Sequence, residues 1–398
     1  MSAGPALTAA GAARRSWFGL AAFYAASFSA LGVYMQFVPA WLHDVQGFGA
    51  ADIAVILSAQ TIARTLAGPL WAQWADRCGD ARRVLSLLSA GALGAFALFA
   101  LAPTLALAWG VAFLFGCLYP PMHAIVDAAS VAQCSRHGFS FGRLRVVGSL
   151  SFLLVILAVG AWLERAGTGD VYGIVLGCLL ATAIAGRLVP RGGGAPPDLT
   201  QAAAAPWWAL LRSRPFVVVL LCSALIQGSH AAYYQLSTVH WGEHGIDKAA
   251  ASILWAEGVL AEIVLLFFAR ATLDRLRPTT LLAVGGLGAA VRWMFVGATT
   301  DFSTLLAVNW LHALSFAATY LGALRALERR VPAAQRATAQ GMLGAATSGG
   351  GMVFCGLCGG FVYDAAGGVA FYLMAAFAGC GALAALWLRR AQDRGGAA

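Results

Sequence analysis

The sequence predicts an all-α membrane protein with twelve transmembrane helices in two six-helix bundles, and two observations carry this prediction. Of the 398 residues, 60% are hydrophobic and only 11% are charged, whereas about a quarter of the residues in a soluble domain are charged. Apolar runs of about 20 residues recur along the whole chain, and such a run is long enough to cross a bilayer as a helix. The alternating pattern of barrel strands is not seen, and helices are the other form that satisfies every backbone group in lipid.

Twelve segments have the length and apolar composition of a spanning helix. In the first half of the chain they are residues 17–40, 51–73, 84–102, 105–128, 144–163 and 171–188. In the second half they are residues 215–241, 249–270, 279–297, 303–325, 337–361 and 368–388. The first run is too long for the apolar core of a typical signal peptide, so we interpret it as an uncleaved first helix.

The basic residues indicate on which side of the membrane each loop lies. The chain holds 26 Lys and Arg residues, and all but Lys248 are arginines. Of these arginines, 22 lie in the termini and in every second loop, whereas the opposite loops hold only Arg165 and Lys248. Because Lys and Arg collect in cytoplasmic loops, we expect both termini in the cytoplasm. The strong Arg bias is typical of a GC-rich bacterial genome and predicts the bacterial inner membrane. The net charge of +9 therefore reflects membrane topology rather than nucleic-acid binding.

A stretch rich in Gly and Pro separates the two sets of spans. Residues 191–198 read Arg-Gly-Gly-Gly-Ala-Pro-Pro-Asp, and these residue types break helices and favour flexible linkers. We therefore expect an N-terminal six-helix bundle at residues 1–188, a cytoplasmic linker at 189–214 and a C-terminal six-helix bundle at 215–398.

Several ionisable side chains lie inside the apolar runs of the second half. Glu257 and Glu262 share one predicted span, and Arg292 and His312 lie in the next two. A charge facing lipid costs several kcal/mol, so we expect these groups to line a wet pathway and to pair with one another or with a substrate. Arg292 is always charged and presents a fork of donors, which suits a substrate carboxylate or a standing partner such as Glu262. Glu257 and Glu262 are about 140° apart around a helix, so they are not expected to reach the same point.

Two further groups of polar residues are candidates for the site. Asp127 and Arg145 lie near the cytoplasmic ends of the fourth and fifth spans, where they would gate the inner side or contact substrate. Gln227, His230 and Tyr234 form a polar and aromatic stripe in the seventh span. The plainer interpretation of each is a side chain that is hydrogen-bonded within a contact between helices.

The loop between the second and third spans resembles a signature of the major facilitator superfamily. Residues 74–83 read Trp-Ala-Asp-Arg-Cys-Gly-Asp-Ala-Arg-Arg, against roughly Gly-x-Leu-Ala-Asp-Arg-x-Gly-Arg-Arg in the family. Ala72 replaces the leading Gly, and residues are inserted before the Arg pair. The resemblance implies that Asp76, Arg77, Arg82 and Arg83 clamp cytoplasmic helix ends during the transport cycle. The alternative is a polar turn that only obeys the charge rule.

Other stretches resemble the 3-phenylpropionic acid transporter-like group, which is related to lactose permease and to nucleoside proton symporters. They are residues 121–127, 141–149, 227–234, 254–262 and 291–300. In the lactose permease branch, helices four, five, eight, nine and ten carry a carboxylate, an Arg, a Glu, an Arg and a His. The matching positions here are Asp127, Arg145, Glu262 or Glu257, Arg292 and His312. The permease has a proton-carrying Glu one turn after that His, and Ser315 stands there in this chain, so the resemblance implies that another residue carries the proton or that coupling is absent.

The resemblance implies a secondary active transporter whose halves rock about a central site. We expect proton-coupled uptake of a small aromatic carboxylate such as 3-phenylpropionate. The expected substrate ligands are Arg292, His230, Gln227, Tyr234, Asp127, Arg145 and His312, and the expected proton carriers are Glu262, Glu257 and Asp127. The alternatives are a nucleoside or sugar proton symporter, an exporter of hydrophobic compounds and a sensor that does not transport.

Motifs for other classes of function are missing from the sequence. It has no Gly-x-Ser-x-Gly elbow, no His-Glu-x-x-His motif and no Walker-type loop, so neither an enzyme nor an ATP-driven pump is expected. Cys355 and Cys358 have the spacing of a metal site but lack a second ligand pair nearby. We therefore expect no cofactor and no metal. The expected partners are an organic acid, protons and the lipid bilayer, with no nucleic acid and with the chain as a monomer.

Overall fold

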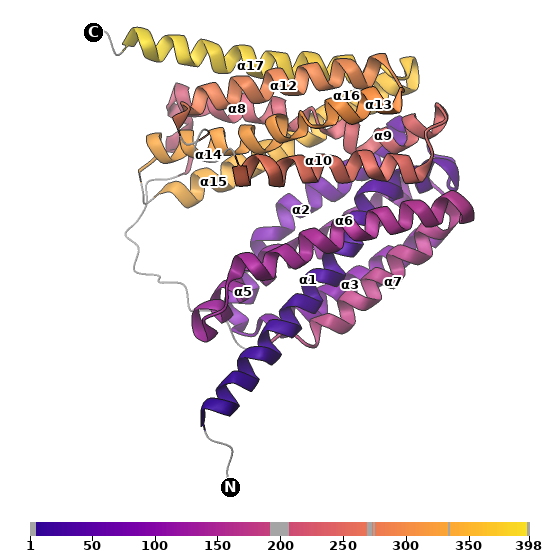
Figure 1. Cartoon of the computed structure of the whole chain (residues 1–398), viewed down its shortest axis with the longest axis vertical. Coiled ribbons are helices and arrows are strands. Elements are labelled where there is room, and N and C mark those ends of the chain that lie inside the picture. Colours follow the sequence, from indigo (N-terminus) through magenta and orange to yellow (C-terminus); the bar gives the residue numbers. More distant parts are fainter. Residues whose placement is uncertain (1–4, 192–206, 269–272, 274, 333–334, 396–398) are drawn as a thin grey trace. The chain divides into compact units, whose positions relative to one another are not determined.

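The computed structural model describes residues 5–191, 207–268, 273, 275–332 and 335–395, and no strand occurs among them. The chain divides into two compact units. One contains Met1–Gly47 and Ala59–Leu199, and the other contains Phe48–Ser58 and Thr200–Ala398. Each is a helical bundle (Figure 1). The division predicted from the sequence stays a prediction, and residues 192–206 of the predicted linker lie outside the described part of the chain.

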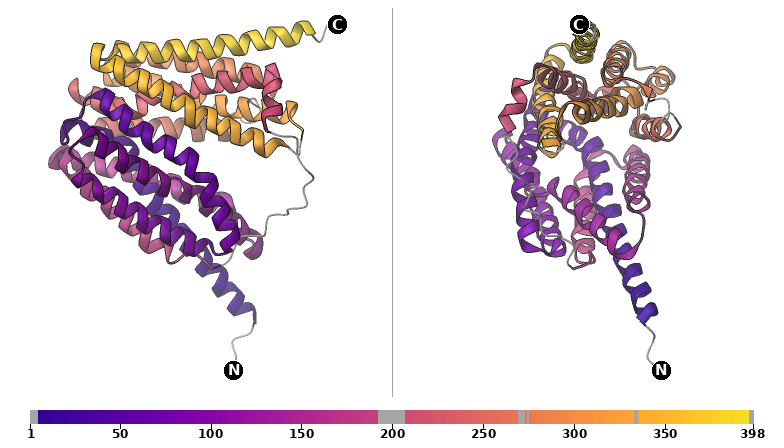
Figure 2. Two further views of the ribbon diagram at one scale, coloured as in Figure 1. Left: turned by 180° about the vertical axis from the view of Figure 1, so that it is seen from behind. Right: turned by 90° about the vertical axis from the view of Figure 1, so that its left-hand side faces the viewer.

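The first unit is built on its long first helix. This helix packs against α6 and α7, and α3 packs against α4 and α7. The N-terminal end of the first helix projects beyond the neighbouring helices of the unit (Figure 2). The helices are α1 (Pro5–Asp44), most of α2 (Ala50–Cys78), α3 (Ala81–Ala97), α4 (Leu105–Leu118), α5 (Pro121–His137), α6 (Phe141–Ala166) and α7 (Val171–Gly186).

The second unit packs α12 against α17 and against the helices that follow it, and α8 packs on α17. Two π-helical segments, Ala313–Ala318 and Ala345–Gly351, interrupt its spans. The α-helices are α8 (Arg214–Gly228), α9 (Ala231–Glu243), α10 (Lys248–Phe268), α12 (Pro278–Ala298), α13 (Phe302–Asn309), α14 (Thr319–Arg330), α15 (Arg336–Gly344), α16 (Met352–Ala366) and α17 (Val369–Gly395).

The predicted spans are helical wherever the structure describes them. Eleven helices are long and apolar enough to cross a membrane, counted over the described residues. The remaining predicted span, 249–270, corresponds to α10, and its residues 269–270 lie outside the described part. The predicted end of the fourth span at residue 128 is wrong, because the helix continues to His137 and ends at Gly138, whose φ of 74° suits a glycine C-cap.

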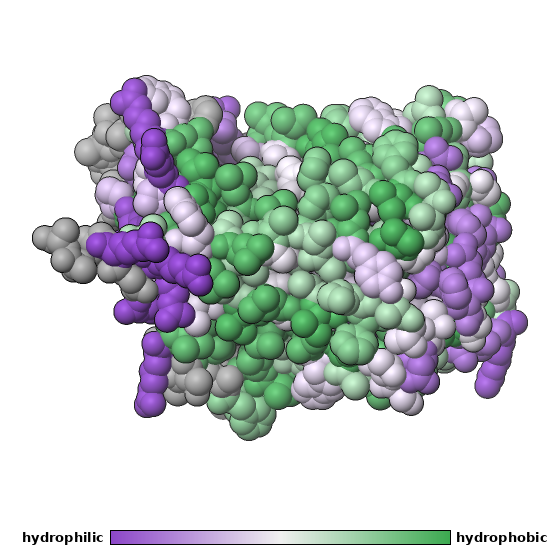
Figure 3. Space-filling model, turned by 90° about the horizontal axis from the view of Figure 1, so that it is seen from above, coloured by the Kyte–Doolittle hydropathy of each residue, from purple (hydrophilic) through white to green (hydrophobic). Residues whose placement is uncertain are grey.

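The surface of the protein agrees with a membrane environment. Figure 3 shows an apolar belt across the middle of one face, with hydrophilic residues at both ends of that belt. Exposed apolar side chains on α12 and α17 include Met294, Leu383 and Trp387. Such a surface is stable where lipid tails cover it and basic ends meet water.

Glycine permits one close contact between helices of the second unit. A Cβ atom on Gly351 would lie only 2.5 Å from the backbone oxygen of Ala224 on α8. Gly228 meets the same segment from the other side, since its Cβ would lie 2.6 Å from the oxygen of Gly351. Only glycine therefore allows α8 and the second π segment to approach this closely.

Substituting Gly351 with alanine is expected to destabilise the protein by about 1–3 kcal/mol, because the added methyl group overpacks a backbone contact. Gly341→Ala is the matched control: no atom lies within 4 Å of its would-be Cβ, and alanine is the better helix former. Thermal unfolding in detergent should show a lower Tm for Gly351→Ala and an unchanged or slightly higher Tm for Gly341→Ala. Equal melting temperatures would contradict the close approach.

Candidate functional site

A chain of three ionisable side chains lies inside the second unit. Arg292 on α12 is fully buried and donates from Nη1 to Nδ1 of His312 at 2.9 Å. Because a guanidinium only donates, this Nδ1 must accept, and the neutral imidazole carries its proton on Nε2. That Nε2 lies 2.8 Å from Oε1 of Glu262 on α10 and donates to it. His312 therefore connects the carboxylate of Glu262 to the guanidinium of Arg292.

The exposure of these three side chains decreases from Glu262 through His312 to Arg292. The side chain of Glu262 is 22% exposed, that of His312 is 7% exposed, and Arg292 is 0% exposed. The sequence suggested Arg292 as a direct partner of Glu262 or as a substrate ligand. The structure instead places an imidazole between the two charges and leaves only the carboxylate end partly accessible.

Asn309 at the end of α13 holds the cationic end of this chain in place. Its Oδ1 accepts from Nε and Nη2 of Arg292 at 3.1 and 2.9 Å, and its Nδ2 donates to the carbonyl of Leu254 on α10 at 3.1 Å. Asn309 and His312 are three residues apart and share a helix face. Asn309 was not among the residues predicted from the sequence. The available signal was an amide in an apolar run, three residues before the histidine.

Aromatic rings surround the guanidinium of Arg292. Its central carbon lies 4.2 Å from the ring centre of Tyr233 and 4.6 Å from that of Trp293. Tyr233 in turn stacks on Trp255 of α10 at 5.3 Å. Cation–π contacts strengthen when they are removed from water, so these rings help to retain a charge that lipid would reject.

His230 and Gln227 occupy the break between α8 and α9. Nδ1 of His230 lies 3.1 and 3.2 Å from the carbonyls of Ile226 and Gln227 and donates to them, and its Nε2 lies 3.0 Å from the hydroxyl of Ser315. The amide of Gln227 donates to the carbonyl of Phe316 in the first π segment at 3.1 Å. Both side chains thus satisfy backbone oxygens near helix irregularities, as membrane helices require. Their contact with substrate stays a prediction.

The second carboxylate of α10 does not join this chain. Glu257 is 9% exposed, lies beside Trp310 and has no hydrogen-bond partner for its Oε2 among the described residues. The separation of about 140° predicted from helix geometry therefore agrees with the structure, in which Glu262 alone reaches His312.

A cavity of about 270 Å³ lies beside the first π segment. Phe316 lines it and stacks on His312, with 5.5 Å between the ring centres. The lining combines aromatic, aliphatic and polar side chains from three spans of the second unit: Gln227, Phe316, Tyr320, Leu324, Gln340, Leu343, Thr347 and Ser348, together with Gly344. A small pocket with aromatic walls and a few polar groups is typical of a site for a small organic ligand.

In the first unit, Asp127 and Arg145 both contact Tyr24. The Tyr24 hydroxyl donates to Oδ1 of Asp127 at 2.5 Å, and the Arg145 guanidinium lies 6.0 Å from the Tyr24 ring and 4.2 Å from that of Phe28. Nη1 of Arg145 also reaches Ser149 at 3.5 Å. In the described part of the chain the two charges thus meet at a tyrosine rather than in an ion pair, and their roles in gating, substrate binding or proton transfer stay predictions.

The predicted clamp residues lie around the turn from α2 to α3. Asp76 and Arg77 end α2, Gly79 turns the chain with a φ of 63°, and Arg82 and Arg83 begin α3. Asp76 is exposed and lines a narrow cleft together with alanines of α5. The structure brings the four residues to one corner of the first unit, and the clamp itself stays a prediction.

Membrane-spanning helical bundles that shelter an Arg, a His and a Glu are the architecture expected of a secondary transporter. Residues 17–374 match the MFS_1 like family, and the chain belongs to this family. It is 28% identical to a probable 3-phenylpropionic acid transporter of Escherichia coli K12, covering 93% of this chain and 96% of that protein. It is 29% identical to the maltose permease of Geobacillus stearothermophilus, covering 89% of each.

Solved structures agree on the fold. The nucleoside transporter NupG superposes with a TM-score of 0.84 at 16% identity, covering 94% of this chain and 98% of that one. The POT family transporter PepTSo superposes with a TM-score of 0.73 at 12% identity, covering 96% and 98%. The chain is therefore a multi-pass membrane transporter of the major facilitator type rather than an enzyme, and it carries a small molecule across a lipid bilayer.

Proposed function

We propose that the protein takes up a small aromatic carboxylate together with a proton. The observation that carries this proposal is the buried chain from Glu262 through His312 to Arg292. It holds one permanent positive charge, one carboxylate that can take up a proton, and an imidazole that joins them.

The charge balance of this chain supplies a coupling mechanism. The guanidinium of Arg292 keeps its charge, and an uncompensated charge in a dry site is costly. Glu262, which contacts His312 as Arg292 does, supplies the balancing negative charge in this proposal. When a proton neutralises Glu262, a substrate carboxylate takes over this role. Proton and anion therefore enter together, and release of both restores the original balance.

His312 transmits the change without storing the proton. Arg292 donates to its Nδ1, so the imidazole cannot also be protonated there while that contact lasts. His312 therefore orients the Glu262 carboxylate, and its imidazole becomes more or less polarised as the charge on that carboxylate changes. Ser315, which stands where lactose permease has a proton-carrying Glu, hydrogen-bonds the carbonyl of His312 at 3.2 Å. This leaves Glu262, with Glu257 as the second candidate, as the proton carrier of the second unit.

The cavity beside Phe316 supports an aromatic substrate. Phe316 and Tyr320 offer ring surfaces, and Gln227 and Thr347 offer polar contacts. The Escherichia coli relative named for 3-phenylpropionic acid favours the same class. A sugar or nucleoside is the second candidate, because amide and hydroxyl groups in the lining suit substrate hydroxyls and a maltose permease is similar to this chain.

A binding screen on the purified protein is expected to select 3-phenylpropionate over maltose and nucleosides. The sharpest control ligand is 3-phenylpropionamide, which keeps the ring and the chain but lacks the negative charge. We expect it to bind at least about tenfold more weakly, because it cannot balance Arg292. Isothermal titration calorimetry at a single pH measures the affinity of the protein for each of the four kinds of ligand. Equal affinity for the acid and the amide would exclude the anion mechanism. Selective binding of maltose or of a nucleoside would show that the substrate is a sugar or a nucleoside instead of an aromatic acid.

We further propose that both termini face the cytoplasm of a bacterial inner membrane and that the chain works as a monomer. The distribution of Arg residues over alternate loops supports the orientation. The proposed bundles at 1–188 and 215–398, joined by the 189–214 linker, would rock about the site. Asp76, Arg77, Arg82 and Arg83 would then hold cytoplasmic helix ends in one state of this cycle.

A further inference from the structure

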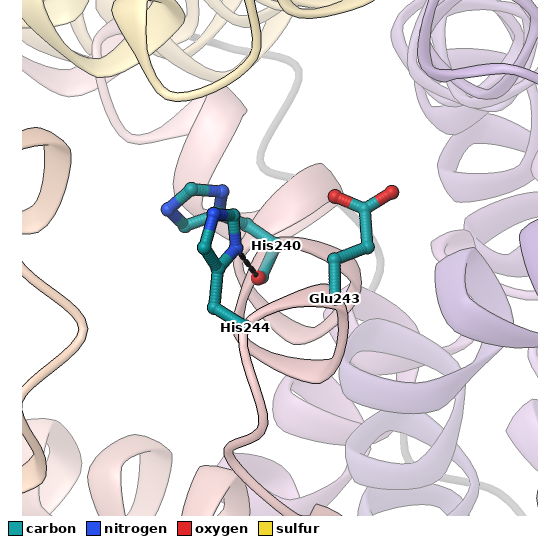
Figure 4. Close-up of side chains that lie close together, drawn as sticks. All are labelled: His240, Glu243 and His244. Atoms are coloured by element: carbon teal, nitrogen blue, oxygen red, sulfur yellow. Dashed lines mark hydrogen bonds between the residues drawn. The ribbon is translucent and has the colours of Figure 1, made fainter.

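The last turn of α9 and its C-cap residue His244 carry three potential metal ligands outside the proposed transport site. His240, Glu243 and His244 are spaced i, i+3 and i+4, which places them on one side of a helix. One ligand atom from each lies within 4.8 Å of the other two, and Figure 4 shows the three side chains leaving the same helix end. We propose that they bind a divalent transition metal ion of the Zn²⁺ type.

His244 is already oriented for this role. Its Nδ1 donates to the backbone oxygen of His240 at 2.7 Å, the dashed line in Figure 4. The proton is therefore on Nδ1, and Nε2 offers its lone pair. Histidines that bind metals generally donate their other ring N–H to a carbonyl or carboxylate in this way. His244 is exposed, so an ion in water can reach it.

Tyr363 on α16 bridges the other two candidate ligands, and an ion that uses Oε2 of Glu243 or Nδ1 of His240 would replace one of these contacts. The hydroxyl of Tyr363 donates to Oε2 of Glu243 at 2.6 Å and lies 3.0 Å from Nδ1 of His240. The hydroxyl has one proton, which the carboxylate accepts, so it receives the N–H of His240. The rings of His240 and His244 are 4.4 Å apart. The ligands are thus gathered before any ion binds, which lowers the cost of ordering them.

The chemistry of the ligand set selects the ion. Two imidazoles and one carboxylate form a three-ligand set that suits Zn²⁺ with an open fourth position. Mg²⁺ and Ca²⁺ prefer oxygen ligands. A helix C-terminus favours a cation, whereas the ammonium of Lys248, which lies next to Gly242, opposes one. No metal was expected from the sequence, because the spacing His-x-x-Glu-His at residues 240–244 is the reverse of His-Glu-x-x-His.

Equilibrium dialysis of the full-length protein with ZnCl₂, after removal of any affinity tag, tests the site. We expect one Zn²⁺ per chain and no comparable binding of Mg²⁺. His244→Ala and Glu243→Gln should each weaken zinc binding at least about tenfold. His137→Ala on α5 is the matched control, since this imidazole lies in the other unit and should leave binding unchanged.

Three results would overturn the site: no zinc bound by the unaltered protein, zinc binding that His244→Ala leaves unchanged, or equal binding of Mg²⁺. The two altered side chains are exposed, so the variants should melt at the temperature of the unaltered protein. A common melting temperature shows that lost binding comes from lost ligands rather than from unfolding. The readout is binding alone, so the result is independent of which substrate the protein carries.

Discussion

Replacing Glu262 with glutamine is expected to reduce accumulation driven by a pH gradient to the level of liposomes without protein. Glutamine keeps the shape and can still accept a hydrogen bond from Nε2 of His312, but its neutral amide cannot take up and release a proton as a carboxylate does. The charge of Arg292 is then never balanced from within the chain, so a substrate anion binds without the proton that would drive it uphill. Exchange of labelled for unlabelled substrate requires no net proton movement and should persist. Proteoliposomes with an imposed pH gradient measure accumulation and exchange on the same preparation.

Glu257→Gln is the matched control for this experiment. Glu257 lies on the same helix and is similarly sheltered, but it does not reach His312. We expect its variant to retain accumulation in a pH gradient. Unchanged uphill uptake by Glu262→Gln would remove Glu262 from the mechanism, and loss of uptake in Glu257→Gln alone would transfer the role to that residue. The same vesicles, prepared in a known orientation, also report whether the protein imports or exports its substrate.

Replacing Arg292 with methionine is expected to lower the free energy of unfolding by about 3–5 kcal/mol and to abolish transport. The guanidinium is fully buried and provides hydrogen bonds to Asn309 and His312. Its removal leaves Nδ1 of His312 and the oxygen of Asn309 without their donor and the carboxylate of Glu262 without its balancing charge. An uncompensated sheltered charge is the costly outcome when one partner of an ion pair is removed. Chemical or thermal unfolding in detergent measures the stability, and uptake in proteoliposomes measures the activity.

A double variant separates the effect of the lost charge balance from the effect of losing the Arg292 side chain itself. Arg292→Met combined with Glu262→Gln removes both charges, so we expect it to recover part of the stability lost in Arg292→Met while remaining inactive. Arg143→Ala is the control, because Arg143 is exposed and its loss should change stability by less than about 0.5 kcal/mol. If the two single changes add without coupling, His312 does not connect them energetically.

The fold followed from the sequence because its signals are local. A run of apolar residues predicts a spanning helix whatever surrounds it, and all twelve predicted spans correspond to helices in the described part of the chain. The misplaced end near residue 128 arose because polar residues of α5 continue the helix beyond the apolar run. The break at Ser229 and His230 and the two π segments were not foreseen, because the length of an apolar run does not indicate local departures from α-helical hydrogen bonding. In the first π segment the carbonyl of Phe316 accepts from Gln227 on another helix.

The site was predicted only in part. Ionisable residues in apolar spans are conspicuous, so Glu262, Arg292 and His312 stood out as candidates. The way these three side chains connect was not predicted. Helix periodicity indicates which residues share a face of a helix, but it does not indicate which other helix packs against that face. For the same reason Asn309 was overlooked, and the contact between His230 and Ser315 was not foreseen.

Run length, loop charge and the presence of charges in apolar segments are properties of neighbouring residues, so the order of amino acids alone predicted a helical membrane protein with ionisable groups inside its spans. The link from Glu262 through His312 to Arg292, and the contacts of Tyr363 with His240 and Glu243, join side chains on different helices. Packing decided these contacts, because a buried polar group must find its partner wherever the folded helices place one.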